Sequence, residues 1–327
     1  MTLPILYKLL ALVAIVALGW VVGRLRWLGD ESADPARVLS NAAFYLFAPA
    51  LFFRATARVD LAHLPWGMLS AFFLPVVGVM LGVYGWQKWR AGLPGHAGAP
   101  VAAPAVRAIT ASFGNSVQIG IPLAAGILGE AGLGLHLTLV SMHALVLLLV
   151  VTTLVEMDLA RAHADGAAGL GQVLLGTARN ALIHPVVLPV LVGLAWNLTG
   201  LGLAEPVDEV LQVLGSAVVP LCLTLIGMSL AYLGLPKSLA GALTISGIKL
   251  LLQPALVLAV AWGVFGLRGL TLSVLVLMAS LPAGSNALMF AQRYRALEGE
   301  TAAVNVLSTL AFVAVAPFWL WVLSLLH

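Results

Sequence analysis

Residues 112–122 read SFGNSVQIGIP and form a polar, glycine-containing stretch ending in a proline, inside an apolar segment that we place at 105–127. A proline removes one backbone donor and frees a carbonyl upstream, and in hydrocarbon such groups must be satisfied by protein, water or a ligand. Residues 280–286, SLPAGSN, repeat the pattern inside a second apolar segment at 269–292. We therefore predict two interrupted membrane helices, broken at 120–122 and at 281–284.

The composition around these stretches is that of a membrane protein. The chain has 327 residues, 61% hydrophobic and 9% charged, and its mean hydropathy is +1.06. An ordinary soluble domain is excluded by these values. Because a bilayer core of about 30 Å requires roughly 20 apolar residues per helix, the apolar runs predict ten spans. They lie at 3–23, 38–55, 64–87, 105–127, 133–155, 181–200, 208–232, 240–265, 269–292 and 301–325.

The basic residues predict how the chain is oriented in the membrane. The connections after the odd-numbered spans hold eleven of them, namely Arg24, Arg26, Arg37, Lys88, Arg90, Arg107, Arg161, Arg179, Lys237, Arg293 and Arg295. The opposite side holds four, namely Lys8, Arg54, Arg58 and Arg268. By the positive-inside rule, we expect a multi-pass protein of the cytoplasmic (inner) membrane with both termini outside the cytoplasm. Because the basic residues are separated by apolar segments, we expect the lipid bilayer and not nucleic acid as a partner.

The two halves of the chain resemble each other. Residues 1–155 and 181–327 each hold five predicted spans, joined by a cytoplasmic linker at 156–180. The second span of each half carries a proline, Pro49 or Pro220, and the fourth span is interrupted. Since five is odd, the second copy must enter the membrane inverted. The sequence thus predicts one all-α transmembrane domain over 1–327, a five-plus-five inverted repeat in which matched breaks indicate the transport site.

The polar residues of the two breaks are candidates for substrate binding. Amide and hydroxyl side chains beside freed backbone groups can hydrogen-bond a ligand at membrane depth. A kinked helix without a ligand is the alternative, but the matched pair of breaks favours a site. The candidates are Asn115, Gln118, Pro122, Pro282, Ser285 and Asn286.

Lys249 is the basic residue that lies well inside a predicted span, and Gln253 follows one turn later on the same face. Ionisable residues within a membrane are costly and often functional. The alternative is a side chain that extends to the interface, but Lys249 lies roughly 13 Å inside its span, beyond the reach of a lysine. We therefore include Lys249 and Gln253 in the substrate site, where Lys249 either contacts the anion or tethers the helices.

His136 and His143 lie seven residues apart and share a face of the fifth span. Histidine can relay protons near neutral pH. A structural hydrogen bond to a neighbouring helix is the alternative.

Signals for catalysis, a metal or a cofactor are missing from the sequence. It contains no His-Glu-x-x-His motif, no phosphate-binding loop and no acidic pair at helical spacing within a span. The single cysteine, Cys222, lies in an apolar segment and has no partner for a disulfide. We expect neither an enzyme nor a metal or cofactor site.

Five runs along the chain resemble the auxin efflux carrier family, which includes bacterial malate and malonate permeases and plant auxin exporters. The runs are 114–122, 179–180, 220–230, 249–254 and 282–294. The resemblance implies a ten-helix fold similar to bile acid sodium symporters, in which broken helices four and nine cross near the midplane. It also implies a scaffold of spans one, two, six and seven, a mobile unit of the other six, an elevator-type mechanism, and a homodimer. The long central loop of the plant members is absent here.

Together these features predict a secondary active transporter of a small organic anion, either a carboxylate or a dicarboxylate, with auxin-like acids included. The positive ends of half-helix dipoles and neutral amides would bind the anion, because the predicted span centres contain no acidic residue. The coupling ion, H+ or Na+, stays open. The alternatives are a sodium-coupled symporter of the bile acid type and a membrane receptor or assembly subunit that does not transport.

Overall fold

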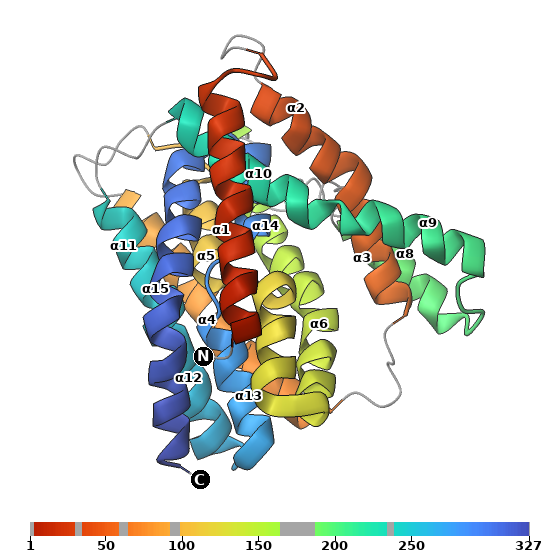
Figure 1. The fold of residues 1–327 in the computed structure, drawn as a ribbon, viewed down its shortest axis with the longest axis vertical. Helices are drawn as coiled ribbons and strands as arrows, with labels where there is room; N and C mark the ends of the chain where they lie inside the picture. Colours follow the sequence, from red (N-terminus) through yellow and green to blue (C-terminus); the bar gives the residue numbers. More distant parts are fainter. Residues whose placement is uncertain are drawn as a thin grey trace.

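The structure is a computed structural model that describes residues 3–29, 35–58, 65–91, 99–163, 187–233 and 239–326, and this part is helical throughout (Figure 1). Its helices are α1 (Leu3–Arg24), α2 (Pro35–Ala42), α3 (Ala48–Ala57), α4 (Trp66–Ala91), α5 (Ala103–Ser112), α6 (Ile121–His163), α8 (Val187–Leu198), α9 (Glu205–Ser216), α10 (Val218–Leu233), α11 (Ala240–Gly247), α12 (Gln253–Ala259), α13 (Gly269–Ser280), α14 (Ser285–Arg293) and α15 (Glu298–Ser324). Both termini lie in the lower half of Figure 1.

Six helical stretches of the described chain are long and apolar enough to cross a membrane: Pro35–Ala57, Trp66–Ala91, Gly126–Ala162, Glu205–Met228, Ala240–Val264 and Glu298–Ser324. They overlap the predicted spans two, three, five, seven, eight and ten. Shorter apolar helices occupy Ala14–Arg24, Leu188–Leu198 and Gly269–Ser280. Residues 181–186 of the predicted sixth span, and residues 164–180 of the predicted linker, lie outside the described residues. Residues 156–163 of that linker continue α6.

Prolines explain most of the irregular turns within these helices. Proline lacks the N–H of a helical hydrogen bond and its ring crowds the preceding turn, so the helix adjusts its register locally. A π-helical turn, Ala43–Phe47, precedes Pro49 at the start of α3, and another, Ile248–Leu252, precedes Pro254 at the start of α12. A third interruption separates α9 from α10 at Ala217, just before Pro220. A further break within α6 occurs at Gly129, where φ is 68°.

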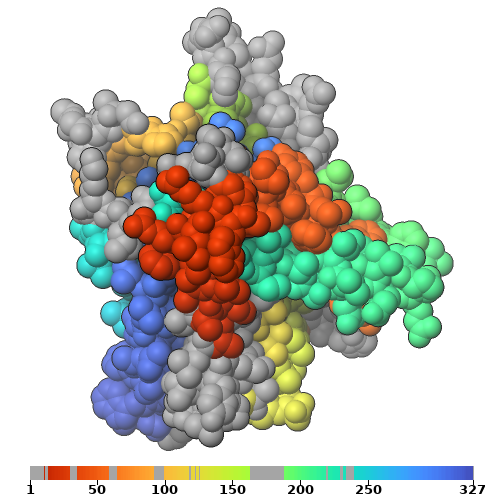
Figure 2. Space-filling view, turned by 45° about the horizontal axis from the view of Figure 1, so that its top comes forward, coloured from red at the N-terminus to blue at the C-terminus, as the bar shows by residue number. Residues whose placement is uncertain are grey.

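Glycines allow α1, α3, α8, α9 and α10 to pack at short range. A Cβ added to Gly227 of α10 would overlap the carbonyl of Val16, and one on Gly19 of α1 would overlap that of Thr224. On Gly193 of α8 a Cβ would likewise overlap a hydroxyl on α3. Contacts this close give good van der Waals packing where no water is available to drive association. In Figure 2, α9 projects from the side of the molecule next to α2 and α3.

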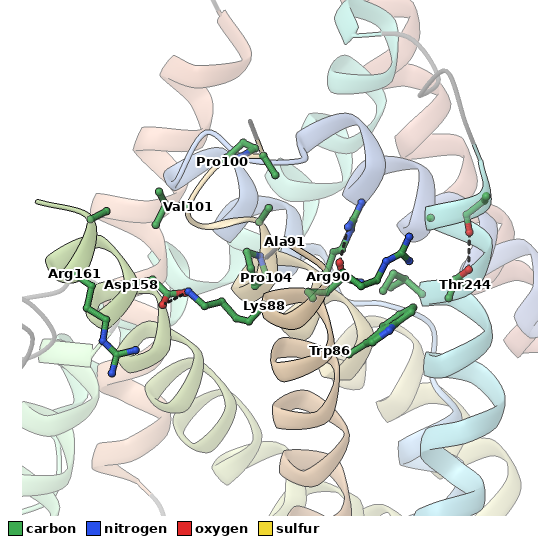
Figure 3. A pocket seen from close by; sticks show the side chains of 18 residues that line it. Trp86, Lys88, Arg90, Ala91, Pro100, Val101, Pro104, Asp158, Arg161 and Thr244 are labelled. Carbon is green, nitrogen blue, oxygen red and sulfur yellow. Dashed lines mark hydrogen bonds and ion pairs between the residues drawn. The ribbon is translucent and has the colours of Figure 1, made fainter. Parts of the chain in front are cut away.

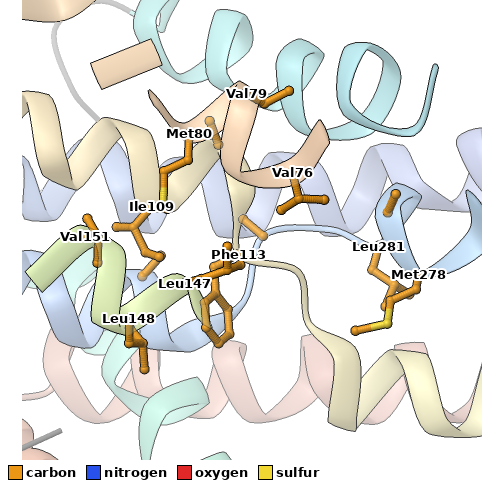
Figure 4. Close-up of a cluster of buried hydrophobic side chains, with 14 of the residues drawn as sticks. Val76, Val79, Met80, Ile109, Phe113, Leu147, Leu148, Val151, Met278 and Leu281 are labelled. Atoms are coloured by element: carbon orange, nitrogen blue, oxygen red, sulfur yellow. The ribbon is translucent and has the colours of Figure 1, made fainter. Parts of the chain in front are cut away.

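The remaining helices, α4, α5, α6 and α11 to α15, pack around an extended apolar core. Figure 4 shows part of it, with Val76 and Met80 of α4, Ile109 of α5, and Leu147 of α6. Phe113 enters the same cluster at the end of α5, and so does Leu281 at the end of α13. The core therefore holds in place the two chain segments at which the helices are interrupted.

Candidate functional site

The two broken helices meet at an antiparallel backbone contact, which we call the crossing and define as residues 113–115 and 281–284. Gly114 pairs with Ala283 in an isolated β-bridge. The N–H of Asn115 donates to the carbonyl of Pro282 at 2.8 Å, and the N–H of Gly284 donates to that of Phe113 at 2.8 Å. Each segment thus provides hydrogen-bond partners for backbone groups of the other, which polar groups within a membrane require.

The first break lies upstream of its predicted position. We expected an interruption at residues 120–122, but the chain leaves the helix after Ser112 and resumes as a π-helical turn, Ser116–Gly120, which leads into α6. Pro122 is the second residue of α6, directly after this π-helical turn, as Pro49 and Pro254 are in α3 and α12 after theirs. The second break is where we predicted it, at Leu281–Gly284 around Pro282.

Beyond the crossing, the chain starts new helices with their N-terminal ends at the crossing itself. The α14 helix begins at Ser285 after the extended residue Gly284, and no side chain caps it. The turn that leads into α6 follows Asn115 and likewise has no side-chain cap. The first N–H groups of a helix lack partners within it, and the helix dipole places partial positive charge there. Two such ends side by side favour an anion.

A cavity of about 250 Å³ opens beside these helix ends. Asn115, Ser285 and Asn286 line it, as do Gly114 and Gly284 of the crossing. The opposite wall comes from α3, α9 and α10, and its charged member is Arg54. The described side chains that line the cavity include no acidic one. Three of the predicted substrate residues therefore share one cavity. The side chains of Gln118 and Pro122 lie outside the described part of the chain.

Arg54 is a residue of this cavity that the sequence did not identify, because we counted it among the basic residues between spans two and three. Its Nε and Nη2 donate to Asp208 of α9 at 2.8 and 3.0 Å, and Nη2 also donates to Gln212 at 2.8 Å. These bonds fix a cation on the wall that faces the helix ends. Arg54 lies shortly after Pro49 within an apolar helix, and this position could have identified it as a candidate site residue.

Lys249 and Gln253 bind the crossing from its other side. The Lys249 ammonium is fully buried and donates to the carbonyl of Ala279 at 2.7 Å, in the last turn of α13. The Gln253 amide donates to the carbonyl of Ser112, the last residue of α5, at 3.2 Å. A cation at a helix C-terminus is favourable because the dipole is negative there. Both side chains therefore hold the ends of the broken helices together, and neither lines the 250 Å³ cavity.

The two predicted histidines pack against the first break. His136 makes a 2.8 Å hydrogen bond between Nε2 and the carbonyl of Ser116. The ring of His143 lies 4.5 Å from that of Phe113, centroid to centroid, and its Nδ1 has no partner in the described structure. Neither histidine lines the cavity.

A second, smaller cavity of about 100 Å³ adjoins the same residues. Asn115 and Ser285 line it too, and Asn305 of α15 adds an amide, but the rest of its wall is largely apolar, with Leu223 and Ile226 of α10 among its members. The crossing therefore adjoins two cavities, of which the one beside Arg54 is the more polar.

The largest cavity, about 780 Å³, lies elsewhere, between α4, α5, α6 and α11 (Figure 3). Two of its basic residues form ion pairs. Lys88 pairs with the buried Asp158 at 2.9 Å, and Arg107 pairs with Glu300 at 2.7 Å. Because it contains no part of the crossing, we assign the site to the smaller cavity despite the difference in volume.

Contacts at the other end of the molecule join α2 to α14 and α15. The Arg37 guanidinium pairs with Glu298 at 2.9 Å and donates to the carbonyl of Gln292 at 2.8 Å. The Arg293 guanidinium lies 5.5 Å from the ring centre of Phe44. Figure 1 shows α2 running from the upper end of the molecule down to α3, which carries Arg54. The crossing is thus open beside Arg54 and covered at the Arg37 end.

Sequence comparisons show the family to which this chain belongs. The model of the family described as "Membrane transport protein" matches residues 4–320. The chain belongs to this family. It is 28% identical over 319 residues to an "Uncharacterized transporter" of Methanothermobacter thermautotrophicus, with 95% of each chain covered. It is also 27% identical over 305 residues to a "Putative malonate transporter" of Rhizobium meliloti, covering 92% of this chain and 90% of the relative.

Membership also bears out the resemblance to auxin efflux carriers that the five sequence runs indicated. The family and both relatives are transporters and not enzymes. The protein is therefore a multi-pass membrane transporter, and the crossing is its candidate substrate site.

Proposed function

We propose that this transporter is a secondary carrier of a small organic anion and that its carboxylate group binds at the crossing. The observation that carries the proposal is the 250 Å³ cavity, where two helix N-terminal ends face Arg54 and no described acidic side chain lines the wall. Amide N–H groups at such ends are suited to a carboxylate. The name of the malonate relative supports this substrate class.

In this proposal the side chains have different roles. Asn115, Ser285 and Asn286 hydrogen-bond the anion, and Gln118 completes the set from the same segment. Pro122 and Pro282 shape the backbone on either side. Lys249 and Gln253 act through the crossing that they hold together. His136 and His143 are kept as a proposed polar or proton relay behind it. The adjoining apolar cavity would house the carbon skeleton of an auxin-like acid, whereas a dicarboxylate would remain in the polar cavity.

We further propose ten spans in a five-plus-five inverted repeat, with repeats at 1–155 and 181–327 joined by a cytoplasmic linker at 156–180. The antiparallel pairing of the two breaks and the equivalent kinks at Pro49 and Pro220 support it. The orientation follows the basic residues, with both termini outside the inner membrane. The cavity beside Arg54 then faces outward, and the Arg37 contacts close the cytoplasmic end.

The packing supports an elevator-type mechanism. The glycine-packed helices α1, α3, α8, α9 and α10 would form the scaffold, together with α2, and the helices around the apolar core would carry the crossing across the membrane. Ion pairs such as Arg37–Glu298 join the two groups and would break when the mobile unit moves. A homodimer formed through the scaffold remains part of the proposal.

The test is uptake of labelled malonate and of a labelled monocarboxylate into proteoliposomes, with imposed pH or sodium gradients. Asn286→Leu should lower uptake at least tenfold while folded protein stays in the membrane, because an amide that binds substrate is not needed for packing. Asn41→Leu makes the same change on an exposed position of α2 and should leave uptake unchanged. Equal loss of folded protein and uptake for Asn286→Leu would contradict the assignment.

The same assay separates the alternatives. A dependence of uptake on sodium would favour a symporter of the bile acid type. Binding of carboxylates without any uptake would instead favour a membrane receptor or assembly subunit.

A further inference from the structure

The Lys249 side chain is a fully buried cation without a fixed counter-charge. Its exposed fraction is 0%, and among the described residues no ion pair joins it to an acidic side chain. Within the described part of the chain its ammonium has one acceptor, the carbonyl of Ala279. An isolated buried charge is so costly that such a group tends to lose its proton unless something compensates the charge. The negative partial charges at the C-terminal ends of α5 and α13 compensate the charge of Lys249 in part.

The substrate cavity lies directly across the backbone from this ammonium. Gly114 lines the cavity, and Lys249 Nζ lies 3.5 Å from the point that a Cβ on Gly114 would occupy. Gly114 thus lies beside both the ammonium and the space where the anion would bind. Charges within protein are screened less than charges in water, so an anion in the cavity and the ammonium would attract each other across this residue.

Several buried polar atoms beside Lys249 also lack partners in the described structure. They are Gln253 Oε1, Ser112 Oγ and His143 Nδ1. Gln253 is bonded to Ser112 through its other amide atom, and His143 is close enough to Lys249 for their charges to interact. Unsatisfied buried acceptors are rare and call for an explanation such as an ordered water or a proton. A proton or water taken up in this region would give these atoms partners.

We propose that Lys249 carries the coupling proton of this transporter, an inference that rests on the proposed function. The amine takes up one proton when an organic anion enters the cavity and releases it when the anion leaves. The proton comes from water on the side to which the cavity opens and returns to water on the other side. When the anion is monovalent, the loaded crossing holds an ammonium and an anion, and the empty crossing holds a neutral amine. The two states then carry the same net charge, which makes both suitable for movement through the membrane.

The surroundings of Lys249 leave few other groups to carry this proton. Helices α5, α11, α12, α13 and α15 pack against its turn. Their charged side chains in the described chain either lie in the pairs Arg107–Glu300 and Arg37–Glu298 or, like Arg268, lie at a helix end. The titratable groups that remain nearby are His143 and, behind it, His136, both on α6.

The experiment measures the protons taken up when malonate, with butyrate as a second probe, binds to the purified full-length protein in detergent. Isothermal titration calorimetry in buffers of different ionisation enthalpy gives this number directly. Above pH 7 the carboxyl groups of both probes are ionised, so any uptake belongs to the protein. We expect close to one proton per bound anion and an affinity that falls about tenfold per pH unit. Binding without proton uptake at every pH between 7 and 9.5 would overturn the inference but leave the anion site intact.

Two variants assign the proton to a residue. Lys249→Met can never be charged and Lys249→Arg always is, so both should bind without proton uptake and with an affinity independent of pH. Lys88→Met is the matched control, because it makes the same change at a lysine outside the crossing, and it should still take up one proton. If His143→Asn loses the proton and Lys249→Arg retains it, the assignment to Lys249 is wrong. If neither probe binds the unmodified protein at any pH, the proposed function fails, and this inference fails with it.

Discussion

Gly284→Ala should separate the two segments of the crossing. An added Cβ would lie 2.9 Å from Phe113 Cδ1 and 3.1 Å from the carbonyl oxygen of Gly114, whereas carbon contacts are most favourable at about 3.5–4.0 Å. The backbone must therefore shift and weaken the 2.8 Å hydrogen bond from Gly284 to Phe113. Overpacking costs roughly 1–3 kcal/mol and a lost hydrogen bond about 1 kcal/mol. Against this, replacing glycine restricts the unfolded chain and returns about 0.4–1 kcal/mol.

The net expectation is a loss of roughly 1–3 kcal/mol of stability. Thermal unfolding of the detergent-purified protein should show it as an apparent Tm lowered by several degrees.

Gly114→Ala is the matched control, because it adds the same atom to a glycine in the other segment of the crossing. There the nearest atoms are 3.5 Å away, at ordinary contact distance. Neither glycine has a positive φ, so the two substitutions differ in steric room and not in backbone strain. Gly114→Ala should therefore leave the Tm unchanged or slightly raised. Equal Tm values for the two variants, or a larger loss for Gly114→Ala, would refute the packing we describe.

Two further predictions concern the proposed scaffold and its contact with the proposed mobile unit. Gly227→Ala would place a Cβ against a backbone carbonyl of α1, so the yield of monodisperse protein in size-exclusion chromatography should fall severalfold. Gly263→Ala is the control, because its added atom meets open space, and its yield should match that of the unmodified protein. Arg37→Gln removes the half-buried ion pair to Glu298. A cysteine introduced at Asn286 should then react faster with an impermeant thiol reagent supplied from the cytoplasmic side. An unchanged rate would argue against a gate at this ion pair.

The sequence predicted an all-helical membrane protein correctly, because hydropathy alone decides whether a segment can reside in lipid, while the ten-span inverted repeat stays a prediction. It located the second break correctly, since Pro282 itself lies in the extended segment. It placed the first break too late. Pro122 suggested an interruption, but the π-helical turn before it accommodates the proline, and the real break lies where Gly114 and Asn115 pair with the other segment. That pairing joins residues far apart in the chain and cannot be read from either stretch alone.

The residues of the site were predicted unevenly for the same reason. Asn115, Ser285 and Asn286 were found because they belong to the breaks, and the structure places all three in one cavity. Arg54 was missed because its role depends on a neighbour, Asp208, that is distant in sequence. For Lys249 the sequence showed a cation without a nearby carboxylate, but it could not show that the acceptor is a main-chain carbonyl of another helix.

The arrangement of helix ends accounts for why one crossing can serve both an anion and a lysine. Two helices, α5 and α13, end there, and two helical segments begin there. The ends with negative partial charge gather on one side and the ends with positive partial charge on the other. A cation on the first side and an anion on the second each stabilise the helix ends they face, and each stabilises the other across Gly114. A cationic substrate in the same cavity would oppose the helix dipoles, Arg54 and Lys249 together. If the proposed site is right, the electrostatics of the crossing select an anion, and its binding depends on the charge of one buried lysine.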